Sequence, residues 1–198
     1  MLLQLFRVQQ WYKNLLIFLP LIFAGLLLDP KSIFLTVLGF FALCCMSSTN
    51  YILNDILDKE KDSIHVEKKY RPIASGKISP FYGALIAGFL AIISLLVAFF
   101  LSEIFFILIL IFFFLTQIYS LYLKEEMFVD LICISTNFVL RAISGAFILS
   151  VRLSPWLIVC TFFLSLFIVI VKRKGELVFL GKNAKKHPEL IIDYLKTK

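Results

Sequence analysis

The stretch "FLTVLGFFALCCMSSTNYILNDILDKEKD", residues 34–62, decides the fold class, because a long apolar run leads directly into an acidic array. The apolar part has about the 20 residues that a helix needs to cross a bilayer. Asp55, Asp58 and Asp62 then follow at intervals of three and four residues, directly after Asn54. If the helix continued, these side chains would share one face. Carboxylates on one face repel each other, so the array indicates a bound cation rather than a stabilising feature.

The whole chain has the composition of a membrane protein. It is 61% hydrophobic with a mean hydropathy of +0.95, more apolar than a soluble domain of 198 residues requires. Six apolar runs are long enough to be membrane spans, at about 14–28, 32–53, 81–101, 104–123, 127–149 and 155–171. Strands of a barrel would alternate apolar and polar residues, and these runs do not. We therefore predict an all-α fold: a polytopic transmembrane helical bundle forming one integral-membrane domain over residues 1–198.

Three smaller features of the sequence allow other interpretations. The first run resembles a signal peptide, but no clear small-residue cleavage site follows Ala24-Gly25, so an uncleaved first helix is expected. All four cysteines lie inside the predicted spans without C-x-x-C spacing, which indicates small buried hydrophobic residues rather than a disulfide framework. His65 and His187 stand alone and do not make a histidine metal site.

The charges fall on one side of the predicted membrane. With six spans, seventeen of the twenty Lys and Arg residues lie on the side of the N-terminus, against Lys31 and Arg152 opposite and Arg141 inside a span. The positive-inside rule makes that side cytoplasmic. Eleven of the thirteen carboxylates share it, so the polar chemistry is predicted to face the cytoplasm. Binding of anionic lipid headgroups explains part of the basic excess.

The acidic array has the oxygen ligands that Mg²⁺ prefers. Magnesium binds through one or two carboxylates while substrate phosphates supply further oxygens. The array therefore suits a diphosphate–Mg²⁺ complex, with Asp55, Asp58 and Asp62 as catalytic residues and metal ligands and Asn54 as a fourth ligand. A solvated acidic turn, softened by neighbouring lysines, is the alternative. The basic stretch "HVEKKYRPIASGKIS", residues 65–79, favours the ligand site because lysine and arginine grip phosphate oxygens.

Further polar residues mark the last two spans. Asp130, Asn137, Arg141 and Ser144 lie near one helical face of the fifth span. An arginine in a span normally faces the bundle interior or a water-filled cavity, although a structural pair between helices or snorkelling would also place it there. Lys124 lies at the end of the preceding span. After the sixth span, "VKRKGEL" (residues 171–177) is typical of a topology anchor, with Glu176 behind it.

Several of these stretches together resemble a known family. "NDILDKEKD" (54–62) followed by "YRPIASG" (70–76) resembles the first aspartate-rich motif of the UbiA-type membrane prenyltransferase superfamily. Three others are similar to its decaprenyl-phosphate phosphoribosyltransferase branch. They are "QQWYKNLLIFLPLIFAG" (9–25), "YSLYLKEEMFVDLICISTNFVLRAISG" (119–145) and "KRKGEL" (172–177). The resemblance covers essentially the whole chain.

The resemblance implies helices around a central cavity and a Mg²⁺-dependent transfer with diphosphate as leaving group. In the branch, a polyprenyl phosphate oxygen attacks the anomeric carbon of 5-phosphoribosyl diphosphate. The implied partners are this lipid, the soluble donor and the bilayer, with no nucleic acid. Asn54, Asp55, Asp58 and Asp62 would hold Mg²⁺ and diphosphate. The implied phosphate and substrate contacts are Lys13, Lys69 and Arg71, and further Lys124, Asp130, Arg141, Lys172, Arg173 and Glu176.

The chain also departs from the family pattern. The superfamily usually has nine transmembrane helices, so the last three are expected to be missing after Lys198. The second D-x-x-x-D motif of aromatic prenyltransferases is absent in its usual form, since Glu189 and Asp193 have the spacing without the context. Prenyl transfer to an aromatic or other acceptor is the alternative activity. An inactive fragment, or a transport or channel subunit, is the alternative of another class, although a transporter would carry ionisable groups deep in several spans.

Overall fold

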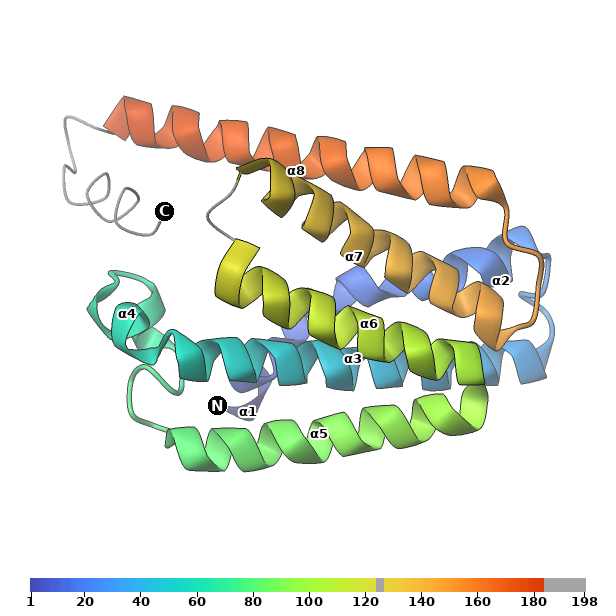
Figure 1. Cartoon of the computed structure of the whole chain (residues 1–198), viewed down its shortest axis with the longest axis horizontal. Coiled ribbons are helices and arrows are strands. Elements are labelled where there is room, and N and C mark those ends of the chain that lie inside the picture. Colours follow the sequence, from blue (N-terminus) through green and yellow to red (C-terminus); the bar gives the residue numbers. More distant parts are fainter. Residues whose placement is uncertain (124–126, 184–198) are drawn as a thin grey trace.

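The computed structural model describes residues 1–123 and 127–183, and this part of the chain is almost entirely helical (Figure 1). Its N-terminal segment contains α1 (Leu2–Leu5), a 3₁₀ helix η1 (Val8–Phe18) and α2 (Leu19–Phe23). The remaining helices are α3 (Pro30–Leu57), α4 (Lys59–Ile64), the 3₁₀ turn η2 (Lys68–Tyr70), α5 (Pro80–Leu101), α6 (Glu103–Ile118), the π-helical turn η3 (Tyr119–Leu123), α7 (Met127–Ile148) and α8 (Pro155–Asn183).

The long helices begin at local signals in the sequence. Asp29 precedes α3, and its carboxylate accepts hydrogen bonds from the backbone N–H (3.0 Å) and the hydroxyl (2.5 Å) of Ser32. Proline fits the first turn of a helix, and Pro30 and Pro80 begin α3 and α5. Ser102 is extended, with φ −168°, and it separates α5 from α6 while its hydroxyl accepts from the N–H of Phe105.

Within the residues that the structure describes, five helices are long and apolar enough to cross a membrane: Pro30–Leu57, Pro80–Leu101, Glu103–Leu121, Val129–Ile148 and Pro155–Lys172. They correspond to the second to sixth predicted spans. The region of the first predicted span, 14–28, differs because it contains the end of η1, then α2 and a turn at Gly25, where φ is +71°. Pro20 cannot donate an N–H to the preceding turn, so one continuous α-helix does not form across it.

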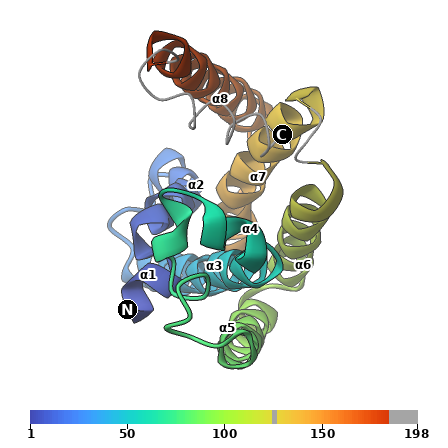
Figure 2. The same cartoon turned by 90° about the vertical axis from the view of Figure 1, so that its left-hand side faces the viewer.

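The five long helices run roughly alongside one another in an open arc (Figures 1 and 2). Helix α3 lies against α5, α7 lies against α8, and η1 packs on both α3 and α7. The main core cluster joins η1, α3, α5, α6 and α7 through residues such as Ile17, Leu43, Met46, Phe105 and Leu140. Helices α3 and α7 are therefore the central ones. Helices α5 and α6 carry no charge along their apolar length, as lipid-facing helices do, and only about a fifth of these two spans is buried.

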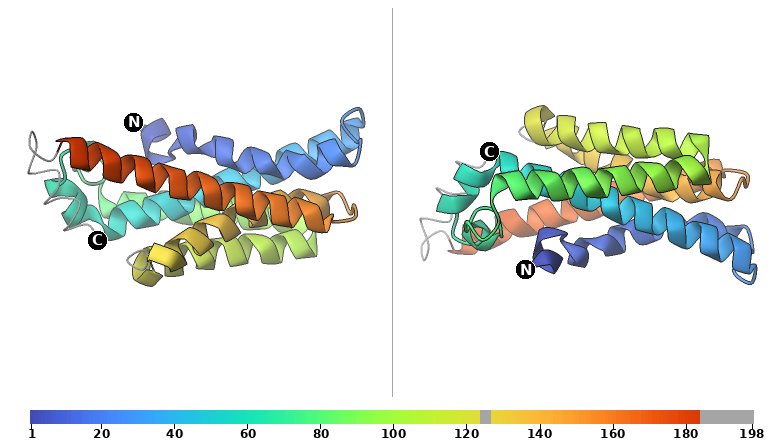
Figure 3. Two further views of the ribbon diagram at one scale, coloured as in Figure 1. Left: turned by 90° about the horizontal axis from the view of Figure 1, so that it is seen from above. Right: turned by 90° about the horizontal axis from the view of Figure 1, so that it is seen from below.

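Short connections bring distant parts of the sequence to one end of the bundle. The α3–α4 junction, the start of α5, the end of α6 and the last turns of α8 all lie at this end in both elongated views (Figures 1 and 3). The α5–α6 and α7–α8 connections lie at the opposite end. The acidic array and the basic stretch after it thus share an end, as the predicted topology requires.

Three of the four cysteines agree with the prediction of buried hydrophobic residues. Cys44, Cys45 and Cys133 are buried, and all four thiols are free. The prediction is wrong for Cys160, which is exposed, because it lines an open groove between α8 and the N-terminal segment.

Candidate active site

Two carboxylates of the acidic array meet two arginines at the end of α3. Asp55 is buried in the last turns of α3, and Asp62 is buried on α4. Arg71 Nη1 lies 3.1 Å from Asp55 Oδ1 and 2.5 Å from Asp62 Oδ2, so a single guanidinium joins both. Arg7 Nη2 lies 2.5 Å from Asp55 Oδ1. We call Arg7, Asp55, Asp62 and Arg71 the aspartate–arginine cluster.

The backbone brings these residues together through a break in the helix. Helix α3 ends at Leu57, and Asp58 (φ −90°, ψ 10°) is the junction from which α4 departs. The three aspartates therefore do not share one continuous helical face. Arg7 adopts a left-handed conformation with φ 49°, which is unusual for a residue other than glycine, and its guanidinium lies 4.8 Å from the centre of the Tyr51 ring.

The predicted metal ligands have the oxygen donors that Mg²⁺ prefers, but the described residues are not already arranged around a metal position. Among the described residues, no group of three or more His, Cys, Asp or Glu side chains is arranged to hold a metal ion. The Asn54 amide oxygen accepts a hydrogen bond from Ser120. Asp55 Oδ2, however, is buried without a hydrogen-bond partner, and such an oxygen is available to a cation. One or two carboxylates plus substrate phosphates is a usual Mg²⁺ ligand set, so the residues fit the ion.

Next to this cluster lies a small polar cavity of about 160 Å³, which we call the Arg141 cavity. Helices η1, α3, α6 and α7 surround it. Its polar walls come from Lys13, Ser47, Asn50, Tyr51, Asn137 and Arg141. Tyr51 belongs to both places, since it lines the cavity and its ring faces the guanidinium of Arg7.

Arg141 is held in place by contacts from three helices. Its Nε donates to Asn14 Oδ1 at 2.8 Å, and its Nη1 donates to the Asn137 carbonyl at 2.8 Å. The rings of Phe112 and Phe138 lie 4.7 and 5.5 Å from its guanidinium carbon. The side chain is 7% exposed, so the prediction that it faces the interior is confirmed, and snorkelling to the far surface is not what the structure shows.

Lys13 lines the same cavity, and its pKa reflects its burial and the cations nearby. Burial, followed by the charges of Arg141, Lys172 and Arg7, lowers the pKa of this ammonium from 10.5 to about 8. Neighbouring cations disfavour an added positive charge, and a bound anion would reverse that effect. The position of Lys13 therefore agrees with its predicted role as a phosphate contact.

The other predicted substrate contacts are placed less centrally. Asp130 is buried on α7 and accepts a hydrogen bond of 2.5 Å from the Tyr119 hydroxyl, outside the Arg141 cavity. Lys69 is exposed, with its ammonium 5.2 Å from the Tyr70 ring centre rather than at the carboxylates. Lys172 is exposed on α8. Lys124 lies outside the described residues, as do the side chains of Arg173 and Glu176, whose backbone is part of α8.

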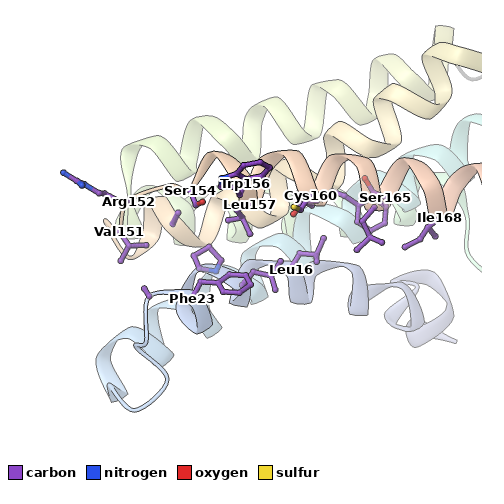
Figure 4. Close-up of a pocket in the computed structure, with 17 residues that line it drawn as sticks. Leu16, Phe23, Val151, Arg152, Ser154, Trp156, Leu157, Cys160, Ser165 and Ile168 are labelled. Carbon is purple, nitrogen blue, oxygen red and sulfur yellow. The ribbon is translucent and has the colours of Figure 1, made fainter.

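A second, larger hollow lies between the N-terminal segment and α8. This apolar groove has a volume of about 760 Å³. In Figure 4, Leu16 and Phe23 of the N-terminal segment face Leu157, Cys160 and Ile168 of α8 across it. The groove is lined almost entirely by apolar side chains, so it offers a surface for a lipid chain rather than for a charged group.

The arrangement of carboxylates and arginines at a helix end in a bundle of apolar helices agrees with the sequence comparison. Residues 17–173, most of the chain, match the UbiA prenyltransferase family. The chain belongs to this family. Membership and the five apolar helices make it an integral membrane protein. The resemblance stated from the sequence motifs is therefore confirmed.

Relatives within the UbiA family include enzymes whose names state their activity. The chain is 31% identical to decaprenyl-phosphate phosphoribosyltransferase of Mycolicibacterium smegmatis over 91% of its own length and 58% of the relative. The enzyme of the same name in Corynebacterium glutamicum is 27% identical over 96% of this chain and 59% of the relative. The chain thus spans about three fifths of the length of these relatives.

A solved structure confirms the fold. A UbiA homolog from Archaeoglobus fulgidus bound to DMAPP and Mg²⁺ superimposes with a TM-score of 0.74 at 22% identity, covering 98% of this chain and 72% of that chain. The predicted UbiA-like helical bundle is therefore correct.

Some residues of this UbiA site were not selected from the sequence. Arg7, Asn14, Asn50 and Gln117 have no site role among the sequence-based predictions. Asn14, Asn50 and Gln117 could have been identified from the sequence, because amide side chains inside apolar runs are costly unless they are paired or functional. Arg7 could not, since its pairing with Asp55 depends on contact between segments 48 residues apart.

Proposed function

We propose that this chain is a Mg²⁺-dependent membrane transferase with diphosphate as the leaving group, moving 5-phosphoribose from phosphoribosyl diphosphate to a polyprenyl, such as decaprenyl, phosphate. The observation that carries the proposal is the aspartate–arginine cluster beside the Arg141 cavity, at one end of an apolar bundle. The relatives that match about 90% of the chain are named decaprenyl-phosphate phosphoribosyltransferases, and this name supports the same substrates.

In this reaction an oxygen of the lipid phosphate forms a bond to the anomeric carbon of the donor, and the bond from that carbon to diphosphate breaks. Bound Mg²⁺ would neutralise charge on the departing diphosphate. Asp55, Asp58, Asp62 and Asn54 would hold the ion. Arg71 is already among these carboxylates and can donate to diphosphate oxygens, with Lys69 and Lys13 as further contacts.

The remaining predicted contacts have supporting roles in the proposal. Arg141 and Lys172 add positive charge near the second anionic substrate. Lys124, Asp130, Arg173 and Glu176 are proposed as further substrate contacts, as the sequence resemblance implies. The cytoplasmic orientation of this end rests on the positive-inside rule, because the basic residues gather where the cluster lies.

Prenyl transfer from a polyprenyl diphosphate to another acceptor is the second candidate. The apolar groove and the DMAPP bound in the related structure favour it. It uses the same carboxylates but places the diphosphate on the lipid rather than on the sugar.

The test is a membrane-fraction assay of the 198-residue chain with labelled phosphoribosyl diphosphate, polyprenyl phosphate and Mg²⁺, with and without chelator. Chelator-sensitive labelling of the lipid is the expected result. Asp58→Asn should abolish labelling, while Glu60→Gln, an exposed carboxylate two residues away, should retain it.

Three other outcomes would change the proposal. Labelling that persists in Asp58→Asn removes that residue from the metal site. Transfer seen only with polyprenyl diphosphate and an aromatic acceptor establishes the second candidate. No transfer with either pair of substrates means that this chain alone is an inactive fragment.

A further inference from the structure

The Arg141 cavity presents hydrogen-bond donors that have no acceptor. Asn50 is 3% exposed, and its Nδ2 is buried without a hydrogen-bond partner. Arg141 uses Nε and Nη1 for Asn14 and Asn137, which leaves Nη2 without a hydrogen bond to any described residue. The ammonium of Lys13 lines the same space. A buried donor without a partner, such as Asn50 Nδ2, is rare in folded proteins and calls for an explanation.

The amide oxygens of Asn50 and Asn14 at the cavity are already engaged. Asn50 Oδ1 accepts from Gln117 Nε2 at 2.7 Å, which directs the Asn50 amide nitrogen away from Gln117. Asn14 Oδ1 accepts from Arg141 and from the Ser47 hydroxyl at 3.3 Å. The unfilled donors at the cavity are therefore Asn50 Nδ2 and the two cations, and together they favour a ligand that accepts hydrogen bonds.

The charge of the cavity has the same sign throughout. No carboxylate lines it, and within the described residues neither Lys13 nor Arg141 pairs with an Asp or Glu. The nearest carboxylate cluster holds its own arginines. Two cations at one cavity in an apolar bundle are costly unless an anion joins them.

We propose that the Arg141 cavity binds a phosphate monoester, with Asn50 Nδ2, Lys13 Nζ and Arg141 Nη2 as its donors. A phosphate offers three strong acceptor oxygens, which matches three unfilled donors. The volume of about 160 Å³ is well below the roughly 300–1,000 Å³ of whole-ligand pockets, so it admits a head group and not the chain attached to it.

This subsite is separate from the aspartate–arginine cluster but adjoins it. Tyr51 lines the cavity and lies 4.8 Å from the guanidinium carbon of Arg7, which in turn binds Asp55. Two anionic groups could thus be held side by side, with one layer of side chains between them. Gln117 and Asn14 are positioning residues, because they orient Asn50 and Arg141 without facing the ligand through a free donor.

Two substrates of the proposed function carry such a group, and in this respect the inference rests on that function. One is the polyprenyl phosphate, and the other is the 5-phosphate of phosphoribosyl diphosphate. The experiment therefore measures binding rather than turnover. It uses the full chain in detergent, with inorganic phosphate, farnesyl phosphate, farnesol and metal-free phosphoribosyl diphosphate as probes.

Asn50→Asp is the decisive variant. It keeps the shape of the side chain, places a carboxylate in the cavity that the two cations line, and should weaken phosphate binding by about 30-fold or more. The same carboxylate should raise the thermal unfolding midpoint without ligand, a gain that a merely structural asparagine would not give. Asn50→Ala should weaken binding by about 3- to 10-fold through the lost donor. Gln9→Glu, the same charge change at an exposed position, should leave the phosphate affinity unchanged.

The competition arms identify the source of the phosphate. Displacement by farnesyl phosphate but not by farnesol assigns the subsite to the lipid, and displacement by phosphoribosyl diphosphate assigns it to the sugar. Either result supports the proposal. It is overturned if wild type does not bind phosphate, if both Asn50 variants bind it as wild type does, or if no monoester displaces it. A chain that binds phosphate in this way but transfers no phosphoribose refutes the proposed function and leaves the subsite standing.

Discussion

Gly145 lies where α7 comes closest to the N-terminal segment, and its replacement by alanine should disturb the Arg141 cavity from a distance. A Cβ at this position would lie far inside 3.0 Å of the Ile17 carbonyl oxygen, and 3.1 and 3.2 Å from Ile17 C and Pro20 Cδ. The neighbour is backbone, so no side chain can rotate away. We expect α7 and η1 to separate by about 1 Å to restore normal contact.

The size of the effect follows from the geometry of one hydrogen bond. Arg141 precedes Gly145 by one helical turn on α7, and Asn14 precedes Ile17 on η1, so the same separation acts on the 2.8 Å bond between them. Lengthened by about 1 Å, that contact leaves hydrogen-bonding range. Overpacking costs about 1–3 kcal/mol, which outweighs the gain of up to about 1 kcal/mol from replacing a helical glycine.

The assay pairs thermal unfolding in detergent with phosphate affinity. Gly145→Ala should lower both the unfolding midpoint and the affinity for phosphate. Gly88→Ala, the same change in the interior of α5 with nothing within 4 Å of the new Cβ, should lower neither. If Gly145→Ala behaves as Gly88→Ala does, the close approach of α7 to η1 does not position Arg141, and the reasoning fails.

Three further predictions follow from the site. Asp55→Asn should lower the free energy of unfolding by about 1–3 kcal/mol, and by more than Asp62→Asn does. The reason is that the Asp55 side chain is 2% exposed and contacts two arginines, whereas Asp62 contacts one. Equal losses of unfolding free energy in a denaturation experiment would contradict this. The pKa of Lys13 is lowered to about 8, and its charged form binds phosphate, so kcat/KM should fall above pH ~8. Lys13→Arg should move this fall to higher pH, because arginine stays charged. If the fall in kcat/KM stays at the same pH in Lys13→Arg, another group titrates there. Removal of Mg²⁺ by chelator should abolish transfer, and added Mg²⁺ should restore it. The thermal unfolding midpoint of the ligand-free chain should not change, because Arg7 and Arg71 already balance the carboxylates. A large fall in that midpoint on adding chelator would indicate a resident structural metal.

Most of the fold was predictable because membrane helices are specified locally. A run of about 20 apolar residues has few structures open to it in a bilayer, and Asp29, Ser79 and Ser102 mark where helices begin. The first predicted span was less predictable. Pro20 was visible, but an eleven-residue 3₁₀ helix before it is uncommon and depends on its packing against α3 and α7.

The site was predictable in its residue types and less so in its pairings. Arg141 could be assigned to the interior because a charge within a span has no stable place facing lipid. The helix break at Asp58 and the pairing of Arg7 with Asp55 could not be assigned, because both depend on contacts between segments far apart in the chain. Spacing places carboxylates along a helix, but it does not show which cation reaches them.

Those pairings also change how the acidic array is understood. Asp55 and Asp62 are stable at the end of an apolar helix because Arg7 and Arg71 neutralise them, so their repulsion is balanced before any ligand arrives. In the proposed function, a Mg²⁺–diphosphate complex brings positive charge for the carboxylates and negative charge for the arginines at the same moment. Each arginine can then exchange a carboxylate for a phosphate oxygen without a net loss of ion pairs. Free Mg²⁺ alone would have to displace the arginines with nothing to receive them, so the cluster favours the metal and the diphosphate together over either one alone.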